Sequence, residues 1–388
     1  MNKDNLDNNQ WQIRCLEEVV DILDGMRKPI KKEDRVTGEI PYYGATGIID
    51  WVKDYIFDEP LILVGEDGEN LRSRVLPMAF KIQGKAWVNN HAHVLRPYKN
   101  VDIDYLTYYL DSISYEDYIT GSAQPKLNQK QLRKVKVLLP HLREQQKVAS
   151  ILSSVDEAIE KTTAIIEQTE EVKKGLMQQL LTKGIGHTKF KKTEIGEIPQ
   201  SWILVKVEEV CDILNGLRKP IKKADRVLGD IPYYGATGVI DWVNDYIFNE
   251  PLVLVGEDGE NIRSRVLPMA FKIEGKSWVN NHAHVLRPKA SIDIDYLELY
   301  LEFIDYEKYI TGSAQPKINQ QVLRKIKVAL PQMEEQKVLS RSINAIASKL
   351  QKEREKLLQL QDIKKGLMQS LLTGKVRVKI DEVEVTQV

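Results

Sequence analysis

A long internal repeat constrains this chain more than any other feature of its sequence. When the sequence is displaced by 191 residues, positions 11–183 match positions 202–374 without a gap. Within this repeat, 51 of the 58 residues at 40–97 are identical to those at 231–288. Solenoid units are about 20 to 50 residues long, so a unit of this length should hold a folded domain of its own. We therefore expect two closely similar domains.

The first part of each copy has the pattern of a small domain rich in β-strands. Short apolar runs alternate with turn residues, as at Leu61-Ile62-Leu63-Val64 and in the run that ends at Pro140. The segment Gly65-Glu66-Asp67-Gly68 predicts a tight turn with Gly68 at a positive φ. Apolar residues at helical spacing predict one helix over 102–118.

A long helix is expected at the end of each copy. No proline occurs between Pro140 and Pro199, and apolar residues recur there at steps of four and three. The helix should end at Lys183-Gly184 after about 40 residues, or roughly 60 Å. Its seam comprises Val148, Leu152, Val155, Ile159, Thr162, Ile166 and Thr169, with a parallel stripe at Ile151, Ala158, Ile165 and Val172. The second seam comprises Leu339, Ile343, Ile346, Leu350, Leu357, Leu360, Ile363 and Leu367, and its helix should end at Thr373-Gly374.

Each of these helices can bury its apolar seam against the other. We expect an antiparallel coiled coil with a pseudo-twofold relation between the copies, because parallel packing would need residues 184–201 to span the whole helix length. The expected fold class is α+β (mixed), with two α/β domains joined by two long helices. The domains are expected at 1–140 and 185–331, the helices at 141–184 and 332–374, and a C-terminal tail at 375–388.

The tail alternates apolar and polar residues in the manner of a strand, with Val376, Val378, Ile380, Val383 and Val385 apolar. One expectation is that it folds back to complete the first domain or the end of the helix pair. The alternative is a tail without fixed structure.

The overall composition excludes several classes of protein. Lys and Arg total 56, as do Asp and Glu, so any basic surface must be local. Cys15 and Cys211 occupy unmatched positions of the repeat and lack the spacing of a disulfide or zinc framework, which favours the reducing cytoplasm. The N-terminus lacks a signal-peptide pattern, and the apolar runs are far shorter than the roughly 20 residues of a membrane span. We expect a cytoplasmic protein with no membrane partner.

The sequence contains no convincing catalytic motif. Gly275-Lys276-Ser277 resembles the end of a phosphate loop, but Ala270 stands where that motif requires glycine. The sequence also contains no dinucleotide-binding, amino-methyltransferase or nucleophile-elbow motif. No cofactor is therefore expected.

Two repeated clusters leave metal chemistry open as an alternative. Asn89-Asn90-His91-Ala92-His93 places two histidines on one side of an expected strand, and Glu66-Asp67-Gly68-Glu69-Asn70 adds carboxylates. The same residues could form only a turn and a polar strand edge. A metal-dependent nuclease is thus one alternative function, and a structural scaffold for partner subunits is another.

Basic, amide and aromatic side chains in the loops suit contacts with DNA phosphates and base edges. In the first copy the candidate DNA-binding residues are Arg27, Lys28, Lys31, Lys32, Tyr43, Thr46, Asn70, Arg72, Ser73, Arg74, Asn89, Asn90, His91, Gln124 and Lys126. In the second copy they are Arg218, Lys219, Lys222, Lys223, Tyr234, Thr237, Asn261, Arg263, Ser264, Arg265, Asn280, Asn281, His282, Gln315 and Lys317.

Three repeated motifs carry a resemblance to a known family. They are Gly121-Ser122-Ala123-Gln124-Pro125-Lys126-Leu127-Asn128 late in the domain, Leu139-Pro140-His141-Leu142-Arg143-Glu144-Gln145 at the start of the helix, and Lys174-Gly175-Leu176-Met177-Gln178-Gln179-Leu180-Leu181-Thr182 at its end. Together with Gly196-Glu197-Ile198-Pro199-Gln200-Ser201-Trp202, their order resembles the specificity subunit of type I restriction-modification systems over nearly the whole chain.

This resemblance implies a non-catalytic DNA-recognition subunit. Its two target-recognition domains would read the two halves of a split double-stranded DNA site, and its helices would dock type I modification (methyltransferase) subunits, two of them, as well as type I restriction subunits. Family members usually join two dissimilar domains, whereas these two are nearly identical. We therefore expect an interrupted palindrome, with differences such as Thr37/Leu228 and Glu33/Ala224 able to relax it.

Overall fold

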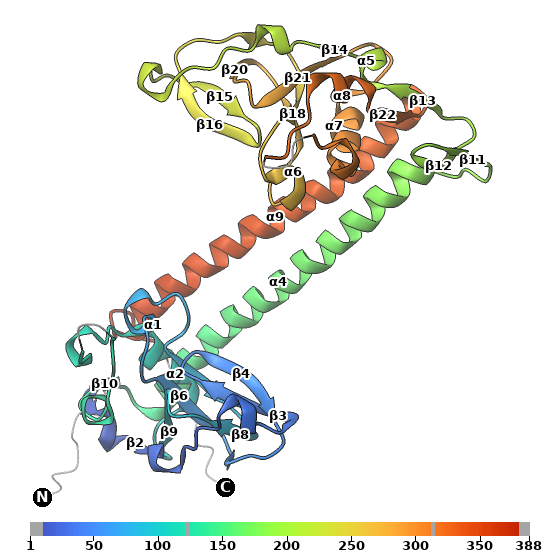
Figure 1. Ribbon diagram of the computed structural model, residues 1–388. Helices are drawn as coiled ribbons and strands as arrows, with labels where there is room; N and C mark the ends of the chain where they lie inside the picture. The colour runs from blue at the N-terminus through green and yellow to red at the C-terminus, as the bar shows by residue number, and fades with distance from the viewer. Residues whose placement is uncertain (1–10, 122–123, 312–314, 380–388) are drawn as a thin grey trace, which may run out of the picture. The chain divides into compact units, whose positions relative to one another are not determined.

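The computed structural model describes residues 11–121, 124–311 and 315–379 (Figure 1). The chain forms two compact units, one made of Met1–Thr163 with Glu355–Val388 and the other of Ala164–Arg354. We call them unit 1 and unit 2. Each unit contains one domain and the neighbouring parts of both long helices.

In unit 1 the domain is built from ten short strands and three short helices in its described residues. The strands are β1 (Gln12–Cys15), β2 (Val20–Ile22), β3 (Thr37–Gly44), β4 (Gly47–Val52), β5 (Phe57–Asp58), β6 (Leu61–Gly65), β7 (Ala79–Ile82), β8 (Lys85–Val88), β9 (Ala92–Pro97) and β10 (Lys136–Leu139). The helices are α1 (Asn70–Ser73), α2 (Ile103–Ser112) and α3 (Gln129–Leu132), followed by the long α4 (Leu142–Lys183).

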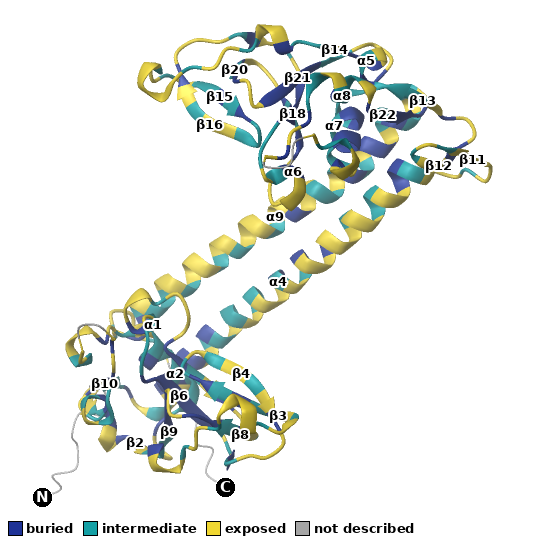
Figure 2. Ribbon diagram, viewed as in Figure 1, coloured by how far each residue is buried: buried dark blue, intermediate teal, exposed yellow. Residues whose placement is uncertain are grey.

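Two four-stranded sheets organise this domain, with strand orders β2-β9-β6-β7 and β4-β3-β8-β5, and β1 pairs with β10. All pairs are antiparallel except β3 with β8. The central strand β6 is apolar throughout because both of its faces are covered, and Leu61 to Val64 are fully buried (Figure 2).

Unit 2 repeats this architecture. Its strands are β13 (Ile203–Lys206), β14 (Cys211–Ile213), β15 (Ile231–Gly235), β16 (Gly238–Val243), β17 (Phe248–Asn249), β18 (Leu252–Gly256), β19 (Ala270–Ile273), β20 (Lys276–Val279), β21 (Ala283–Pro288) and β22 (Lys327–Leu330). Its short helices are α5 (Val207–Val210), α6 (Asn261–Ser264), α7 (Ile294–Phe303) and α8 (Gln320–Lys325). The long α9 (Met333–Leu371) follows them, and its last part, from Glu355, belongs to unit 1. A hairpin of β11 (Phe190–Thr193) and β12 (Gly196–Pro199) precedes the domain.

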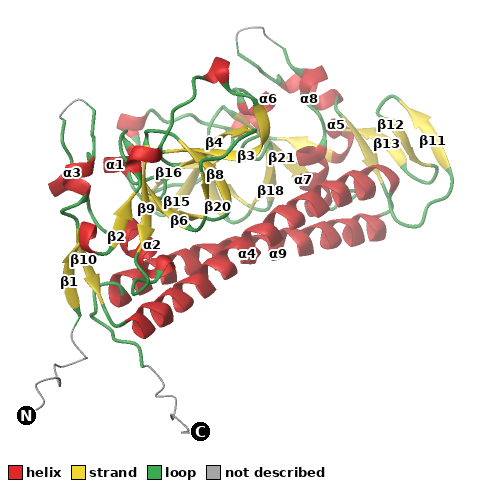
Figure 3. Cartoon of the chain, turned by 90° about the horizontal axis from the view of Figure 1, so that it is seen from below, coloured by secondary structure: helices red, strands yellow, loops and turns green. Residues whose placement is uncertain are grey.

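The two long helices pack antiparallel in each unit, where they lie side by side (Figure 3). In unit 1, Lys364 near the end of α9 lies 2.6 Å from Asp156 near the start of α4. In unit 2, Arg354 of α9 lies 2.5 Å from Glu170 of α4. These contacts confirm the expected antiparallel coiled coil and the mixed α+β fold.

Most residues of the expected seam are buried or partly buried, but two of its positions are wrong. Val148, Leu152 and Ile166 are buried, whereas Val172 is 58% exposed and Ile363 is 51% exposed. A straight α-helix drifts about 20° per heptad relative to an exact seven-residue repeat, so a heptad pattern extended over many turns assigns some residues to the wrong face.

A buried glutamine fastens the start of each long helix to its domain. The Gln145 side-chain amide donates to the carbonyl of Pro140 (2.9 Å) and its oxygen accepts from the backbone N–H of Asp102 (2.8 Å). Gln336 makes the same two bonds in unit 2, at 2.9 and 2.7 Å. This clamp explains the glutamine of the motif that opens each helix.

The short helix expected over 102–118 is wrong at its C-terminal end, because α2 stops at Ser112. Asp102 begins it by accepting from the N–H of Tyr105, as an N-cap. At the other end the Arg74 guanidinium donates to the carbonyls of Asp111 and Ile113 and so stops the helix. The expected turn at Gly68 is confirmed, with φ of 103°.

The described part of the C-terminal tail folds back onto unit 1. Arg377 forms a bidentate ion pair with Glu144 at the start of α4, at 2.6 and 2.8 Å. Residues 375–379 form no strand, and the rest of the expected strand lies outside the described residues. Within the described ranges, the chain has no helix both long and apolar enough to cross a membrane.

Candidate nucleic-acid interface

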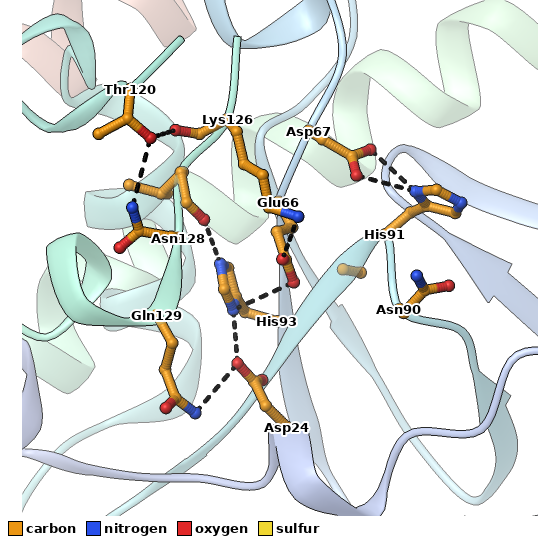
Figure 4. A network of polar contacts seen from close by, with 12 residues as sticks. Asp24, Glu66, Asp67, Asn90, His91, His93, Thr120, Lys126, Asn128 and Gln129 are labelled. Carbon is orange, nitrogen blue, oxygen red and sulfur yellow. Dashed lines mark hydrogen bonds and ion pairs between the residues drawn. The ribbon is translucent and has the colours of Figure 1, made fainter. Parts of the chain in front are cut away.

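A buried histidine joins three loops at one end of the sheet in unit 1 (Figure 4). The His93 side chain is fully buried, and its Nδ1 lies 2.7 Å from a carboxylate oxygen of Asp24. Its Nε2 lies 2.6 Å from the carbonyl oxygen of Leu127. The Leu127 carbonyl is an acceptor, as is the Asp24 carboxylate when ionised, so this geometry suits a His93 imidazolium that donates from both ring nitrogens.

Two further cations complete this hub, which we define as Asp24, Arg27, Glu66, His93 and Lys126. Arg27 Nη1 lies 2.6 Å from Glu66 and 2.8 Å from the carbonyl of Ala92, and Lys126 Nζ lies 3.1 Å from Glu66. Burial tends to raise the pKa of both carboxyls. The hydrogen bonds and positive charges of His93 and Arg27 outweigh burial, so the pKa of each carboxyl falls below its usual value.

The second copy differs at one position of this hub, where Asn215 replaces Asp24. The Asn215 amide donates to Nδ1 of His284 at 2.8 Å, while Nε2 of His284 lies 2.7 Å from the carbonyl of Ile318. His284 is therefore the neutral tautomer with its proton on Nε2. Burial, the largest effect, lowers the pKa of this imidazole, as expected for a neutral ring.

The neighbouring glutamines follow the same exchange of donor and acceptor. In unit 1 the Gln129 amide donates to Asp24 at 3.2 Å, whereas in unit 2 the Gln320 oxygen accepts from Asn215 at 3.2 Å. A backbone hydrogen bond is the same in both units. The N–H of Val94 donates to the Asp24 side chain and the N–H of Val285 donates to the Asn215 side chain, both at 3.0 Å. The two hubs thus have the same shape, but the charged pair of Asp24 and His93 is replaced by the neutral pair of Asn215 and His284.

The hub holds in place the loops that carry several exposed polar side chains. Asn90 and His91 directly precede β9, and Gln124 and Lys126 lie within three residues of Leu127. The backbone N–H of Leu127 also donates to the carbonyl of Glu66 at 2.7 Å. His91 is half exposed, with Nδ1 2.9 Å from Asp67. Amide, imidazole and ammonium groups on two adjoining loops can donate to base edges and phosphates.

The candidate DNA-binding residues fall into two groups by their surroundings. In unit 1 the exposed group comprises Lys28, Lys31, Lys32, Thr46, Arg72, Ser73, Asn90, His91, Gln124 and Lys126. In unit 2 it comprises Lys219, Lys222, Lys223, Arg263, Ser264, Asn281, His282, Gln315 and Lys317, with Thr237 partly exposed. The remaining residues are buried or partly buried: Arg27, Tyr43, Asn70, Arg74, Asn89, Arg218, Tyr234, Asn261, Arg265 and Asn280.

The buried group is engaged within the domain. Arg74 has φ of 52°, a left-handed conformation that is uncommon for a residue other than glycine, and its guanidinium holds the end of α2. Asn70 bonds both backbone groups of Leu76 at 2.9 Å. Asn89 accepts from the N–H of His91 at 2.8 Å. Arg265, Asn261 and Asn280 repeat these contacts in unit 2.

The two histidines that suggested a metal site do not converge. His91 contacts Asp67, while His93 points into the hub (Figure 4). Ligand atoms of Asp24, Glu66 and His93 do lie within 4.8 Å of one another. Arg27 already contacts both of these carboxylates and Lys126 contacts Glu66, and the second copy has an amide in place of Asp24, so this donor set does not fit a divalent metal.

Sequence reasoning missed Asp24, Gln129 and their equivalents. The only signal for Asp24 was its exchange for Asn215 close to a strongly matched part of the repeat. Asp and Asn side chains have the same shape but differ in charge. The exchange of Asp24 for Asn215 therefore marks the position where the hydrogen-bonded histidine differs in protonation between the copies.

Comparison with known proteins places this architecture in a family. The family model of the type I restriction modification DNA specificity domain matches residues 8–171 and 199–361. The type I restriction enzyme MjaVIII specificity subunit of Methanocaldococcus jannaschii is 28% identical, with 95% of this chain and 93% of that protein covered. The putative MjaX specificity subunit of the same organism is 33% identical over 74% of this chain and 71% of its own.

A solved structure shares the fold. The type I restriction-modification S subunit from M. genitalium superposes with a TM-score of 0.66 at 15% identity, covering 95% of this chain and 97% of that one. The family model matches both copies of the repeat and most of the sequence. The chain therefore belongs to the family of type I restriction-modification specificity subunits.

Proposed function

We propose that this chain directs type I modification and restriction subunits to a split DNA site, of which each domain reads one half. The observation that carries this proposal is the repetition of the exposed loop residues around the hub. Asn90, His91, Gln124 and Lys126 recur as Asn281, His282, Gln315 and Lys317. In this proposal these side chains read bases, and the exposed lysines and arginines of the neighbouring loops contact phosphates.

The two half-sites should have the same sequence in opposite senses. The reading residues are the same in both copies, and α4 runs antiparallel to α9. We therefore infer an interrupted palindrome, in which a half-site, an unspecified spacer and the reverse complement follow one another.

The parts of the chain divide the work in this proposal. Residues 1–140 and 185–331 are the target-recognition domains, and the helices at 141–184 and 332–374 hold two modification subunits and the restriction subunits. The chain needs no cofactor of its own, since methylation and cleavage belong to its partners, and it acts in the cytoplasm, where its free cysteines stay reduced.

The test is to co-express the chain with its modification subunit and map adenine methylation across a genome by single-molecule sequencing. An interrupted palindrome is expected. A split motif with unlike halves would contradict the symmetry argument, and the absence of sequence-selective methylation beside an active partner would contradict the function.

Residue roles can be tested with paired variants in the same complex. His91→Ala with His282→Ala should cost about 1–3 kcal/mol at a specific base pair and relax selectivity there. Lys28→Ala with Lys219→Ala should weaken binding to all sequences alike and lower the slope of log affinity against log salt by roughly 0.9 per lost phosphate contact.

A further inference from the structure

Each domain carries exposed apolar side chains on an edge strand, which we call the apolar ridge. In unit 1 they belong to β4, the outer strand of the sheet β4-β3-β8-β5 (Figure 2). Ile48, Ile49 and Trp51 are each about half exposed. Their counterparts on β16 are exposed to nearly the same extent and are Val239, Ile240 and Trp242. An exposed apolar edge strand favours aggregation unless a partner covers it.

A β-bulge sets the shape of this ridge. Tyr42 of β3 pairs with Asp50 and Tyr43 pairs with Ile48, so Ile49 has no residue opposite it. The same irregularity lies opposite Ile240 in unit 2. Bulges re-aim side chains next to functional sites. Because both copies keep the bulge and the apolar side chains, the ridge serves a role that the two domains share.

The ridge adjoins the loop of Asn90 and His91. A Cβ atom on Gly44 would lie 3.1 Å from Cγ2 of Ile49 and 3.6 Å from Nδ2 of Asn89, so both side chains border this glycine. Asn89 in turn accepts from the N–H of His91. The corresponding distances at Gly235 in unit 2 are 3.0 and 3.6 Å, to Ile240 and Asn280. The ridge and the loop therefore form adjoining parts of one surface.

The β3–β4 hairpin that carries the ridge is fixed at two points. A Cβ atom on Gly65 would lie 3.1 Å from the carbonyl oxygen of Ala45, so the tip of the hairpin packs closely against the end of β6. Arg35 pairs with Asp50 at 2.9 Å, and its guanidinium lies 4.5 Å from the centre of the Tyr42 ring. These contacts fasten the hairpin to the loop at 27–35.

This loop gives the ridge basic surroundings. Residues 27–35 contain five Lys or Arg and two Asp or Glu, and residues 218–226 contain five and one. Lys28, Lys31 and Lys32 are exposed, whereas Asp50, the one charged residue of β4, is paired with Arg35. Apolar side chains flanked by cations are complementary to double-stranded DNA, because its major groove presents thymine methyl groups between two rows of phosphates.

We propose that the apolar ridge enters the major groove beside the polar loops and packs against the C5-methyl groups of thymines. Ile49 contacts a methyl group next to the base pair read by the loop of Asn90 and His91, and Ile240 does the same in the other half-site. This inference rests on the proposed function and adds to it an apolar element of specificity for A·T pairs.

Removing single methyl groups from the DNA tests this proposal. The full chain is assembled with its modification subunit and bound to duplexes that carry the methylated motif, in which each thymine in turn is replaced by deoxyuridine in both halves. At one position or more, the replacement should weaken binding about fourfold for each methyl group lost, as expected when one buried methyl group is removed. In Ile49→Ala with Ile240→Ala, this penalty should disappear, because the side chain that contacts the methyl group is missing.

The matched control variant is Ile13→Ala with Ile203→Ala. It shortens two exposed isoleucines on separate sheets, which β1 forms with β10 and β13 forms with β22. This variant should retain the full penalty for deoxyuridine. Each penalty is a ratio of two affinities measured with the same protein, so a small loss of stability in either variant does not affect it.

The outcomes separate this proposal from its alternatives. A penalty for deoxyuridine that depends on Ile49 and Ile240 supports it. The absence of a penalty at every thymine, or an equal penalty in the variant and the wild type, overturns it. If Ile49→Ala with Ile240→Ala fails to assemble with the modification subunit in the absence of DNA, the proposal is overturned in favour of a protein partner on the ridge. A wild-type complex without sequence-selective methylation would contradict the proposed function itself, and this inference with it.

Discussion

Exchanging Asp24 and Asn215 between the two hubs tests the assignment of a charged His93 and a neutral His284. In Asp24→Asn, the new amide can donate to Nδ1 of His93 once that nitrogen gives up its proton, as Asn215 does for His284. A charge-assisted hydrogen bond of about 1.5–3 kcal/mol is then exchanged for a neutral one of about 0.5–1.5 kcal/mol. The free energy of unfolding should fall by only about 1 kcal/mol.

Removing the side chain altogether should cost far more. Asp24→Ala leaves His93, the N–H of Val94 and the amide of Gln129 without their acceptor. Each buried polar group left unpaired costs about 1–3 kcal/mol, so a loss of at least about 3 kcal/mol is expected. Asn215→Ala is the matched variant in unit 2 and should lose a comparable amount.

The pH dependence gives the sharper test because the two hubs should lose stability in different pH ranges. The pKa of His284 is lowered by burial, so the stability it contributes is present above its ordinary value of 6.5 and is lost as the pH falls below that value. The pKa of Asp24 is also lowered, so its contribution is lost only in acid below its ordinary value of 3.8. Unit 2 should therefore weaken first on mild acidification.

Reciprocal substitutions should move this behaviour from one unit to the other. Asp24→Asn should make unit 1 lose stability below about pH 6.5, by at most about 1.4 kcal/mol per pH unit for one proton. Asn215→Asp should remove the same loss from unit 2, because a carboxylate can pair with protonated His284.

Amide exchange measured at pH 7.5 and 5.5 in the full chain can assign the changes to 126–129 or 317–320. If Asp24→Asn destabilised unit 1 as much as Asp24→Ala does, or left its pH dependence unchanged, the charge assignment would be refuted.

Two further predictions concern groups that anchor the helices. Gln145→Ala should lower the free energy of unfolding by about 2–4 kcal/mol, since it leaves one buried and one partly buried backbone group unpaired, and Gln336→Ala should cost the same. A cost no larger than that of a surface Gln→Ala change would argue against the clamp. Arg74→Ala should destabilise unit 1, because the carbonyls at the end of α2 lose their donor. Arg72→Ala should leave stability unchanged and lower only the salt dependence of DNA binding. The reverse pattern would contradict a structural role for Arg74 and a phosphate contact for Arg72.

The sequence predicts features set by local patterns or by the repeat. The two long helices, their antiparallel pairing and the turn at Gly68 follow from periodicity, turn residues and the need to bury a seam. The exposure of Val172 and Ile363 could not be predicted from an idealised heptad, because it depends on the actual twist of each helix. The early end of α2 depends on Arg74, which is distant in sequence.

The hub was beyond sequence reasoning for a related reason. Its members come from four separate segments; Glu66 and His93 were considered only as possible metal ligands, and Asp24, Arg27 and Lys126 each have the ordinary properties of a surface residue. Arg27 and Lys126 were among the residues predicted to bind DNA, but their contacts with Glu66 depend on the way the loops meet. Asp24 carried no motif at all.

The discontinuity of unit 1 has a consequence for the order of events during synthesis. Tyr105, Val148 and Leu152 pack against Leu371 and Leu372, which the ribosome makes near the end of the chain. Unit 2, in contrast, is one continuous stretch. At about 5–20 residues per second, the remaining chain after Thr163 takes on the order of 10–45 s to complete. For that interval the nascent first domain presents an uncovered apolar surface, which makes it a natural client for chaperones.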